Sequence, residues 1–138
     1  MKANRKQQQG VVMLEALLGI FIFSIGILAM IGMQAVAVKN TIEAQYRIEA
    51  GFLANEIIGT MWVNNAANPA AFATASCGST PACAAWVTKV QLMMPGSTGA
   101  LAPTIVVAGS QVTVTVFWQK AGETSSHNHQ VVAQISRA

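Results

Sequence analysis

The chain has 138 residues, enough for one modest domain and an anchoring segment but not for two full domains. Hydrophobic residues make up 53% of it and charged residues only 9%, against roughly 25% charged residues in an ordinary soluble domain. The chain is therefore expected to contact lipid or to bury much of its surface against other subunits. Its net charge of +3 comes from Lys2, Arg5 and Lys6, because the other five basic side chains balance five acidic ones. No basic cluster remains in the body of the chain, which argues against a nucleic-acid partner.

The chain opens with a short basic leader, residues 1–10, and continues with an almost wholly apolar stretch, residues 11–38, whose only charge is Glu15. A helix of that length extends roughly 42 Å, more than the ~30 Å hydrocarbon core of a bilayer requires. Basic residues in front of such a segment favour a cytoplasmic N-terminus. An alternative is a secretory signal cleaved after the Ala-Val-Ala at 35–37, but the apolar run is too long for an ordinary signal.

The helical pattern continues beyond the apolar stretch, through residues 39–64. Apolar side chains recur there at spacings of three and four, which predicts one stripe of an amphipathic helix: Ile42, Tyr46, Ala50, Leu53, Ile57 and Met61. Glu43 and Arg47 are spaced to form an ion pair on that helix. We expect a single helix from about Val11 to about Asn64, which ends before Pro69.

Residues 65–96 are expected to form a loop and one short element. Trp86, Val90 and Met93 favour a helix over 82–94, although a strand stays open, and Pro95-Gly96 ends the element. Tryptophans at three positions are expected to pack between helix and sheet: Trp62, Trp86 and Trp118.

Residues 97–136 change to a period of two, typical of strands. Runs at 104–108 and 111–119 flank Gly109-Ser110, and a third strand is expected at 130–136 after a polar loop at 121–128. In the second run Val112, Val114, Val116 and Trp118 should share one face. The predicted fold class is α+β, with one long N-terminal helix packed on a small antiparallel sheet.

Cys77 and Cys83 are the only cysteines. An even count in a small exported domain predicts a disulfide, and so an oxidising compartment. Their spacing is not a usual metal-ligand spacing. His127 and His129 have no third ligand nearby in sequence, and we expect both in a solvated loop. We therefore predict no metal and no cofactor.

The composition also bears on catalysis. The chain has no Asp, and no motif places His beside Ser or Cys as an activated nucleophile. We therefore expect that the protein is not an enzyme.

The most informative stretch is Gly10 followed by Val-Val-Met-Leu and then Glu15. A carboxylate in an apolar membrane helix costs about 2.5–3.5 kcal/mol at the membrane centre and less near an interface. Glu15 must therefore lie near an interface, be neutral or be paired. Cleavage after Gly10 would create an α-amino group on Val11, and in a helical stack this amine would meet Glu15 of a neighbour. Alternatively, Glu15 lies at the headgroup level without a role.

This stretch resembles the type IV pilin and pseudopilin family, whose members have a short basic leader ending in glycine, an apolar first mature residue and glutamate at the fifth mature position. The resemblance implies that a prepilin peptidase cuts after Gly10 and methylates the new amine of Val11. It also implies a type IV pilin-like fold, with residues 39–138 as a periplasmic globular domain. Many members have phenylalanine where this chain has Val11, which is also apolar.

Within the family the chain is most similar to the minor pilins of the PilV group, the type IV pilus modification proteins. The matching residues are Ser24 to Leu28, Gly32 to Gln34, Leu53 to Glu56, Met61, Asn64, Trp86, Pro95-Gly96, Val112 to Val114 and Trp118. The resemblance implies a minor pilin that takes part in starting or modifying pilus assembly. Its implied partners are a prepilin peptidase, major and other minor pilins, an inner-membrane assembly platform and the bilayer.

Two alternatives remain at the level of sequence. A minor pseudopilin of a type II secretion system would carry the same leader and helix. A periplasmic binding module on a signal anchor would keep its leader and would not depend on Glu15. For the pilin, the expected location is the bacterial inner membrane, single-pass, with the N-terminus cytoplasmic and the C-terminal domain periplasmic, and the filament after assembly.

Overall fold

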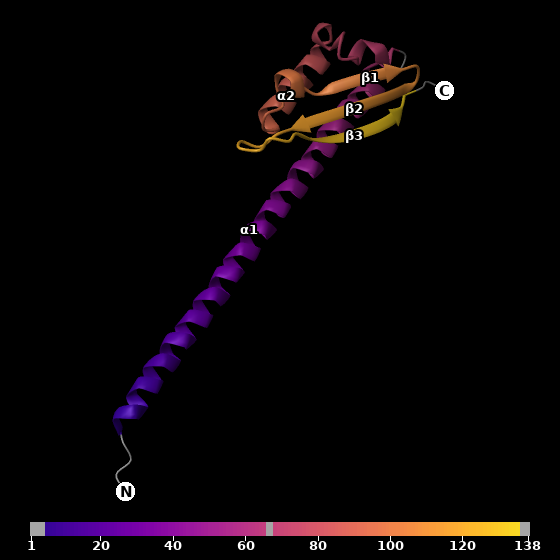
Figure 1. The fold of residues 1–138 in the computed structure, drawn as a ribbon. Coiled ribbons are helices and arrows are strands. Elements are labelled where there is room, and N and C mark those ends of the chain that lie inside the picture. Colours follow the sequence, from indigo (N-terminus) through magenta and orange to yellow (C-terminus); the bar gives the residue numbers. More distant parts are fainter. Residues whose placement is uncertain (1–4, 66–67, 136–138) are drawn as a thin grey trace. The chain divides into compact units, whose positions relative to one another are not determined.

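The computed structural model describes residues 5–65 and 68–135, with side chains at 10–64 and 68–135. The chain divides into two compact units, residues 1–42 and 43–138. Figure 1 shows the arrangement of the elements, in which one long helix precedes a shorter helix, three 3-10 turns and a sheet. This is the α+β layout that the sequence predicts.

The first element is the helix α1, Arg5–Asn65. It confirms the predicted helix at 11–64, but it begins within the leader rather than at Val11. Glutamines are good helix formers, and one interior glycine such as Gly10 costs only about 1 kcal/mol relative to alanine. Residues 5–10 therefore join the helix instead of forming a separate segment.

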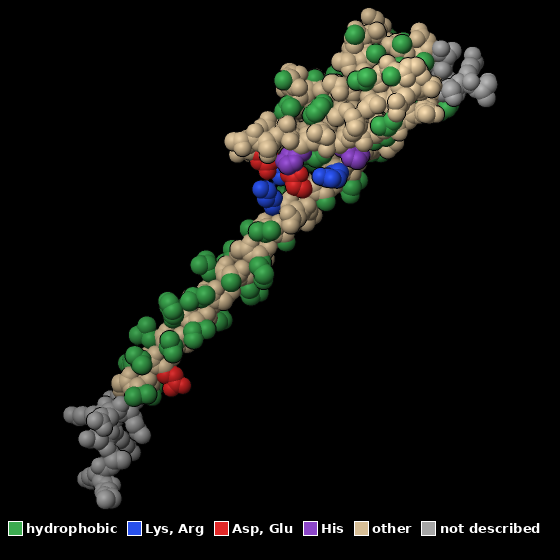
Figure 2. Space-filling model, turned by 45° about the vertical axis from the view of Figure 1, so that its right-hand side comes forward, with side chains coloured by type: hydrophobic (Ala, Val, Ile, Leu, Met, Phe, Trp, Pro, Cys, Tyr) green, Lys and Arg blue, Asp and Glu red, His purple; other side chains and the backbone are tan. Residues whose placement is uncertain are grey.

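In the first unit the apolar side chains of α1 stay exposed. Between Val11 and Val38 every large hydrophobic residue is at least 43% exposed, and Figure 2 shows them spread along the helix. The hydroxyls of Ser24 and Thr41 donate to carbonyl oxygens four residues earlier, at 2.7 and 2.9 Å, which satisfies them without water. The helix is long and apolar enough to span a membrane.

The second unit contains the helix α2, Pro81–Met93. The sequence left helix and strand open for residues 82–94, and the structure has a helix there. Pro81 occupies its first turn, where a missing N–H costs nothing. Pro95 disfavours helical geometry in the residue before it, and Met94 is extended with φ −102° and ψ 120°. The predicted loop before α2 contains two 3-10 turns, η1 at Pro69–Phe72 and η2 at Cys77–Ser79. A third, η3 at Gly99–Leu101, precedes the sheet.

The sheet has three antiparallel strands in the order β1-β2-β3. They are β1, Thr104–Ala108, β2, Gln111–Trp118, and β3, His127–Gln134. The β1–β2 turn contains Gly109 at φ 63°, a conformation that glycine adopts without strain. In β2 the four predicted inward residues are all buried and the residues between them are more exposed.

The third strand begins earlier than the sequence predicts. It starts at His127 rather than at residue 130, and its last strand residue is Gln134, while Ser136 lies outside the described residues. Placing His127 and His129 in a solvated loop was wrong, because they pair with Trp118 and Val116 of β2. The sequence around these histidines is polar, so cross-strand pairing rather than local pattern extends the strand.

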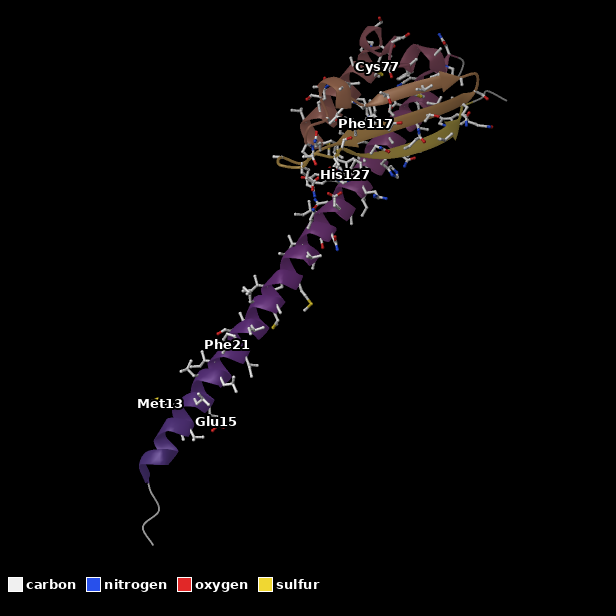
Figure 3. All side chains as sticks on the ribbon, viewed as in Figure 1. Met13, Glu15, Phe21, Cys77, Phe117 and His127 are labelled. Atoms are coloured by element: carbon white, nitrogen blue, oxygen red, sulfur yellow. A yellow bond between two sulfur atoms is a disulfide. The ribbon has the colours of Figure 1, made fainter. Side chains whose placement is uncertain are left out.

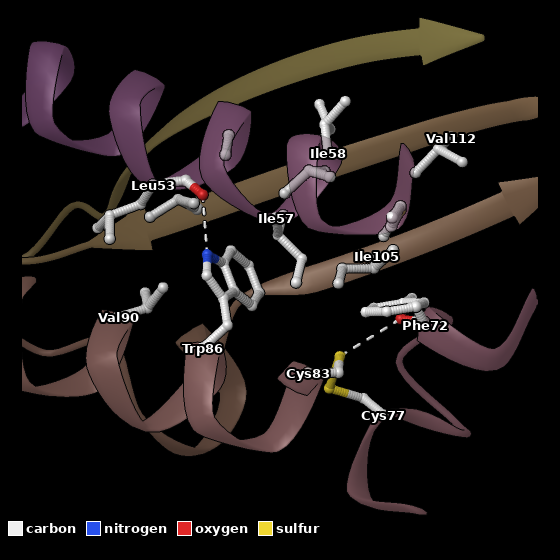
Figure 4. Close-up of a cluster of buried hydrophobic side chains, with 14 of the residues drawn as sticks. Leu53, Ile57, Ile58, Phe72, Cys77, Cys83, Trp86, Val90, Ile105 and Val112 are labelled. Carbon is white, nitrogen blue, oxygen red and sulfur yellow. Dashed lines mark hydrogen bonds between the residues drawn. A yellow bond between two sulfur atoms is a disulfide. The ribbon is translucent and has the colours of Figure 1, made fainter. Parts of the chain in front are cut away.

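The core lies between the second half of α1, the inner face of the sheet and α2 (Figure 4). The predicted stripe of α1 supplies it from Tyr46 onward, whereas Ile42 is 37% exposed. Trp86 and Trp118 are 4% and 0% exposed and confirm the expected packing. Trp62 does not, since 47% of it is exposed. It follows Met61 on the helix, and successive helical residues point about 100° apart.

Candidate functional site

The predicted processing residues lie together on one exposed part of α1. Val11 is 65% exposed, and Glu15 follows one helical turn later, so the two residues share a face. Figure 3 shows Glu15 projecting from the helix on the side opposite Met13. Glu15 forms no hydrogen bond or ion pair with any residue whose side chain the structure describes. In an apolar environment this carboxylate would lack a partner among the side chains that the structure describes.

Gly10 has no packing role in the fold. A Cβ built at this position meets nothing within 4 Å, and the same is true of Gly19, Gly26 and Gly32 further along the helix. Each interior glycine weakens a helix by about 1 kcal/mol relative to alanine. The described residues therefore give no steric reason for glycine at position 10.

The disulfide that the sequence predicts is present. Cys77 and Cys83 are joined with a Cα–Cα distance of 5.1 Å, within the range that disulfides adopt. The bond connects η2 to the first turn of α2, and its Cys83 end is fully buried (Figure 4). A disulfide of this kind is typical of an oxidising compartment. The bond stabilises the turn that brings α2 onto the core.

A cluster of charged side chains in the second unit was not found from the sequence. Glu43 on α1 contacts Lys120, which follows β2. The Nζ atom of Lys120 also lies 3.3 Å from Oε1 of Glu123. His127, the first residue of β3, places Nε2 at 3.1 Å from Glu123 Oε2 and Nδ1 at 3.8 Å from Glu43 Oε2. We call these four residues the charged clamp, because they connect α1 to the segment between β2 and β3 (Figure 2).

The clamp shifts the pKa values of its members. The hydrogen bond with Lys120 lowers the pKa of Glu43 and raises that of Lys120. Burial alone would raise the pKa of Glu123, but hydrogen bonds with His127 and Lys120 lower it below its ordinary value. Each shift favours the charged form, so Glu43, Lys120 and Glu123 are held as an ion-pair network at neutral pH.

Three clamp residues also bear on the metal prediction. Ligand atoms of Glu43, Glu123 and His127 all lie within 4.8 Å of one another, so the argument that His127 lacks further ligands was wrong. Lys120, however, contacts both carboxylates and already supplies the positive charge that a cation would bring. The arrangement fits a structural clamp better than a metal centre, and the absence of a metal stays a prediction.

The clamp replaces the ion pair predicted between Glu43 and Arg47. Residues four apart on a helix can pair, but Arg47 is exposed while Glu43 is half-buried against the β2–β3 segment. His129, the second histidine, lies away from the clamp and packs over Gly51, where a Cβ would meet its Nε2 at 3.3 Å. No local sequence pattern connects α1 to a lysine beyond the second strand, so periodicity had no means of finding the clamp.

A second ion pair connects the two helices of this unit. Nζ of Lys89 on α2 lies 2.8 Å from both carboxylate oxygens of Glu56 on α1, and 5.8 Å from the ring centroid of Phe52. Both charged side chains are more than a third exposed, so the pair contributes little to stability.

No protein-family model, curated protein or solved structure matches the chain.

Proposed function

We propose that this chain is a minor type IV pilin, similar to the PilV group, that takes part in starting or modifying pilus assembly. A prepilin peptidase cuts it after Gly10 and methylates the amine of Val11, and the chain then joins major and other minor pilins at an inner-membrane assembly platform. One observation carries the proposal. Glu15 has no partner among the side chains that the structure describes, it lies on an exposed apolar stretch of helix, and it follows by five residues a glycine against which no described residue packs.

The energetics of Glu15 support an intermolecular partner. An unpaired carboxylate in hydrocarbon is costly, and the chain offers none of its own described side chains to offset that cost. An α-amine at Val11 of a neighbouring subunit supplies an opposite charge at the right depth, because both groups lie within one turn of the same helix. Removal of the leader therefore creates the group that Glu15 requires.

The two ends of the chain support a single-pass topology. Three basic residues and no acidic ones lie in the first ten residues, which favours a cytoplasmic N-terminus. The disulfide lies in the second unit and is typical of the periplasm rather than the cytoplasm. We therefore place residues 11–38 in the bacterial inner membrane and the second unit in the periplasm.

The first test is the intact mass of the membrane-extracted protein, co-expressed with and without a prepilin peptidase. We expect the loss of residues 1–10 and the gain of one methyl group only when the peptidase is present. Gly10→Val should block cleavage, whereas Gly19→Val, at an equally open position of the same helix, should leave it intact. A full-length mass in both samples, or cleavage near residue 37, would refute processing. The first result would leave a signal-anchored binding module and the second a secreted domain.

The second test separates insertion from assembly. Glu15→Gln should insert and be cleaved normally but should be lost from sheared filaments, because a neutral side chain gives the neighbouring amine no counter-charge. Normal incorporation of this variant would show that the pairing is wrong. The same residues fit a minor pseudopilin, and we would distinguish the two by deleting the pilus or the type II secretion platform and asking which deletion stops incorporation.

A further inference from the structure

The outer edge of β3 presents a row of unpaired backbone groups. Ile135 N donates to Ser110 O at 2.7 Å, and the β2–β3 register continues from this pair without a break. Hydrogen-bonded pairs alternate along an antiparallel ladder, so every second residue of β3 points its N–H and C=O away from β2. Within the described part of the chain none of these groups has a backbone partner: they belong to Asn128, Gln130, Val132 and Gln134.

This edge lacks the features that usually protect a free strand. Edge strands are normally short, charged, interrupted by proline or bulged. β3 has eight residues, His-Asn-His-Gln-Val-Val-Ala-Gln, without a charged acid, lysine, arginine or proline, and it pairs with β2 in one continuous register.

The opposite edge of the sheet is partly occupied. β1 has five residues, and Thr74 occupies the outward backbone groups of Ile105. Thr74 N donates to Ile105 O at 2.9 Å, and Ile105 N donates to Thr74 Oγ1 at 2.7 Å. The same sheet thus has one edge that Thr74 partly covers and one edge that no described residue covers.

We propose that the open edge of β3 receives an extended strand from another polypeptide, which adds a fourth strand to the sheet. The complement of alternating outward N–H and C=O groups is the backbone of an extended strand, and main-chain hydrogen bonds supply the affinity of this mode of binding. The partner strand should carry no charged side chains where it pairs with β3, and its polar and apolar side chains should alternate. One side of it faces the polar outer surface around Gln130 and the other extends the half-buried row that includes Val131.

A second copy of this chain fits the edge poorly. Antiparallel pairing of two β3 strands places a two-fold axis through the sheet, which reverses the second-unit part of α1 in the second copy, because that part packs on the sheet. Two copies anchored in one membrane must point the same way, an argument that rests on the proposed anchoring. Pairing of β3 with β1 of another copy keeps the direction but meets Thr74.

The test uses the full chain in lipid nanodiscs that hold one copy each, with amide exchange of β3 followed by NMR. The probe is a synthetic peptide, Lys-Thr-Val-Thr-Val-Thr-Val-Thr-Lys, and its control has proline at the central position. We expect the alternating peptide, but not the proline peptide, to slow exchange of the four outward amides by roughly tenfold or more.

Two variants make the test specific to this edge. Val132→Pro removes an outward N–H without touching the β2 ladder and should abolish the slowing. Val107→Pro makes the same change on the outward side of β1 and should leave the slowing of exchange by the peptide intact. Gln130→Pro repeats the test at a second position if the first variant does not fold.

Several results would overturn the proposal. One is unchanged exchange with the peptide, and another is equal slowing in Val132→Pro. Slow outward amides without peptide would mean that the chain covers its own edge, and slowing only in discs with two copies would make the second copy the occupant. Neither a peptidase nor a pilus enters this test, so its failure leaves the proposed pilin function untouched.

Discussion

Phenylalanine in place of Trp86 should cost more stability than the same change at Trp118. Both indoles are buried, at 4% and 0% exposure, so both changes remove the same atoms from the core. They differ in the indole N–H. Nε1 of Trp86 donates to the backbone carbonyl oxygen of Leu53 at 2.8 Å and connects α2 to α1 (Figure 4), whereas Nε1 of Trp118 has no acceptor among the described residues.

The difference between the two variants isolates that hydrogen bond. Loss of the same ring atoms should cost about 1–2 kcal/mol at either site. At Trp86 a net contribution of about 1 kcal/mol from the hydrogen bond is lost as well, while at Trp118 an unpaired buried donor worth about 1 kcal/mol or more disappears. We therefore expect Trp86→Phe to be roughly 2 kcal/mol less stable than Trp118→Phe.

Hydrogen exchange of the β2 amides is a suitable assay, because these core amides report global opening of the second unit and do not rely on a tryptophan signal. A difference of 2 kcal/mol corresponds to roughly 30-fold in the opening equilibrium. Equal losses of stability in the two variants, or a larger loss in Trp118→Phe, would refute the assignment of the Trp86 hydrogen bond as a link between the helices.

Three further predictions concern the second unit. The pKa of Glu43 is lowered in the folded protein, so the carboxylate stabilises the fold at any pH above its unfolded pKa, and this stabilisation is lost as pH falls through its folded pKa. Acid should therefore destabilise the wild type more steeply than Glu43→Gln. Denaturation series between about pH 6 and about pH 3 measure this difference. Gly96→Ala should lower the free energy of unfolding, measured in urea, by about 2 kcal/mol or more. Its φ is 69°, and the added Cβ would lie 2.7 Å from the backbone oxygen of Gln119. Gly99→Ala is the control: its φ is 59° but its Cβ would meet nothing, so it should cost only about 1 kcal/mol. Reduction of the disulfide should lower the free energy of unfolding by about 2 kcal/mol, and an unchanged melting curve after reduction would contradict this.

Local periodicity was sufficient to predict most of the helices and strands from the sequence. The spacing of three and four along α1 identified Leu53 and Ile57 as core residues, and the period of two in β2 identified its buried face. These patterns are visible because one element buries one face. The expectation that Trp62 packs between helix and sheet was based on its residue type and not on this spacing, and it was wrong.

The remaining features depend on residues distant in sequence or outside the chain. The clamp joins Glu43 to Lys120 across nearly the whole second unit, and β3 starts at His127 because β2 provides a partner. The proposed cleavage position is different again. Gly10 and Glu15 were singled out from the sequence by a resemblance to the type IV pilin family, and their proposed roles, which depend on a peptidase and a neighbouring subunit, stay predictions that the described residues neither require nor explain.

The hydrogen bond from Trp86 to α1 also has a consequence for the order of synthesis. Its acceptor on Leu53 is made 33 residues before its donor, and the strands that cover the rest of α1 are made later still. At about 5–20 residues per second, the core face of α1 leaves the ribosome seconds before anything can cover it. We expect the nascent chain to rely on a chaperone or the membrane surface during that interval, and a chain truncated before β2 to be degraded rapidly. A long-lived truncated chain would show that α1 and α2 protect each other without the sheet.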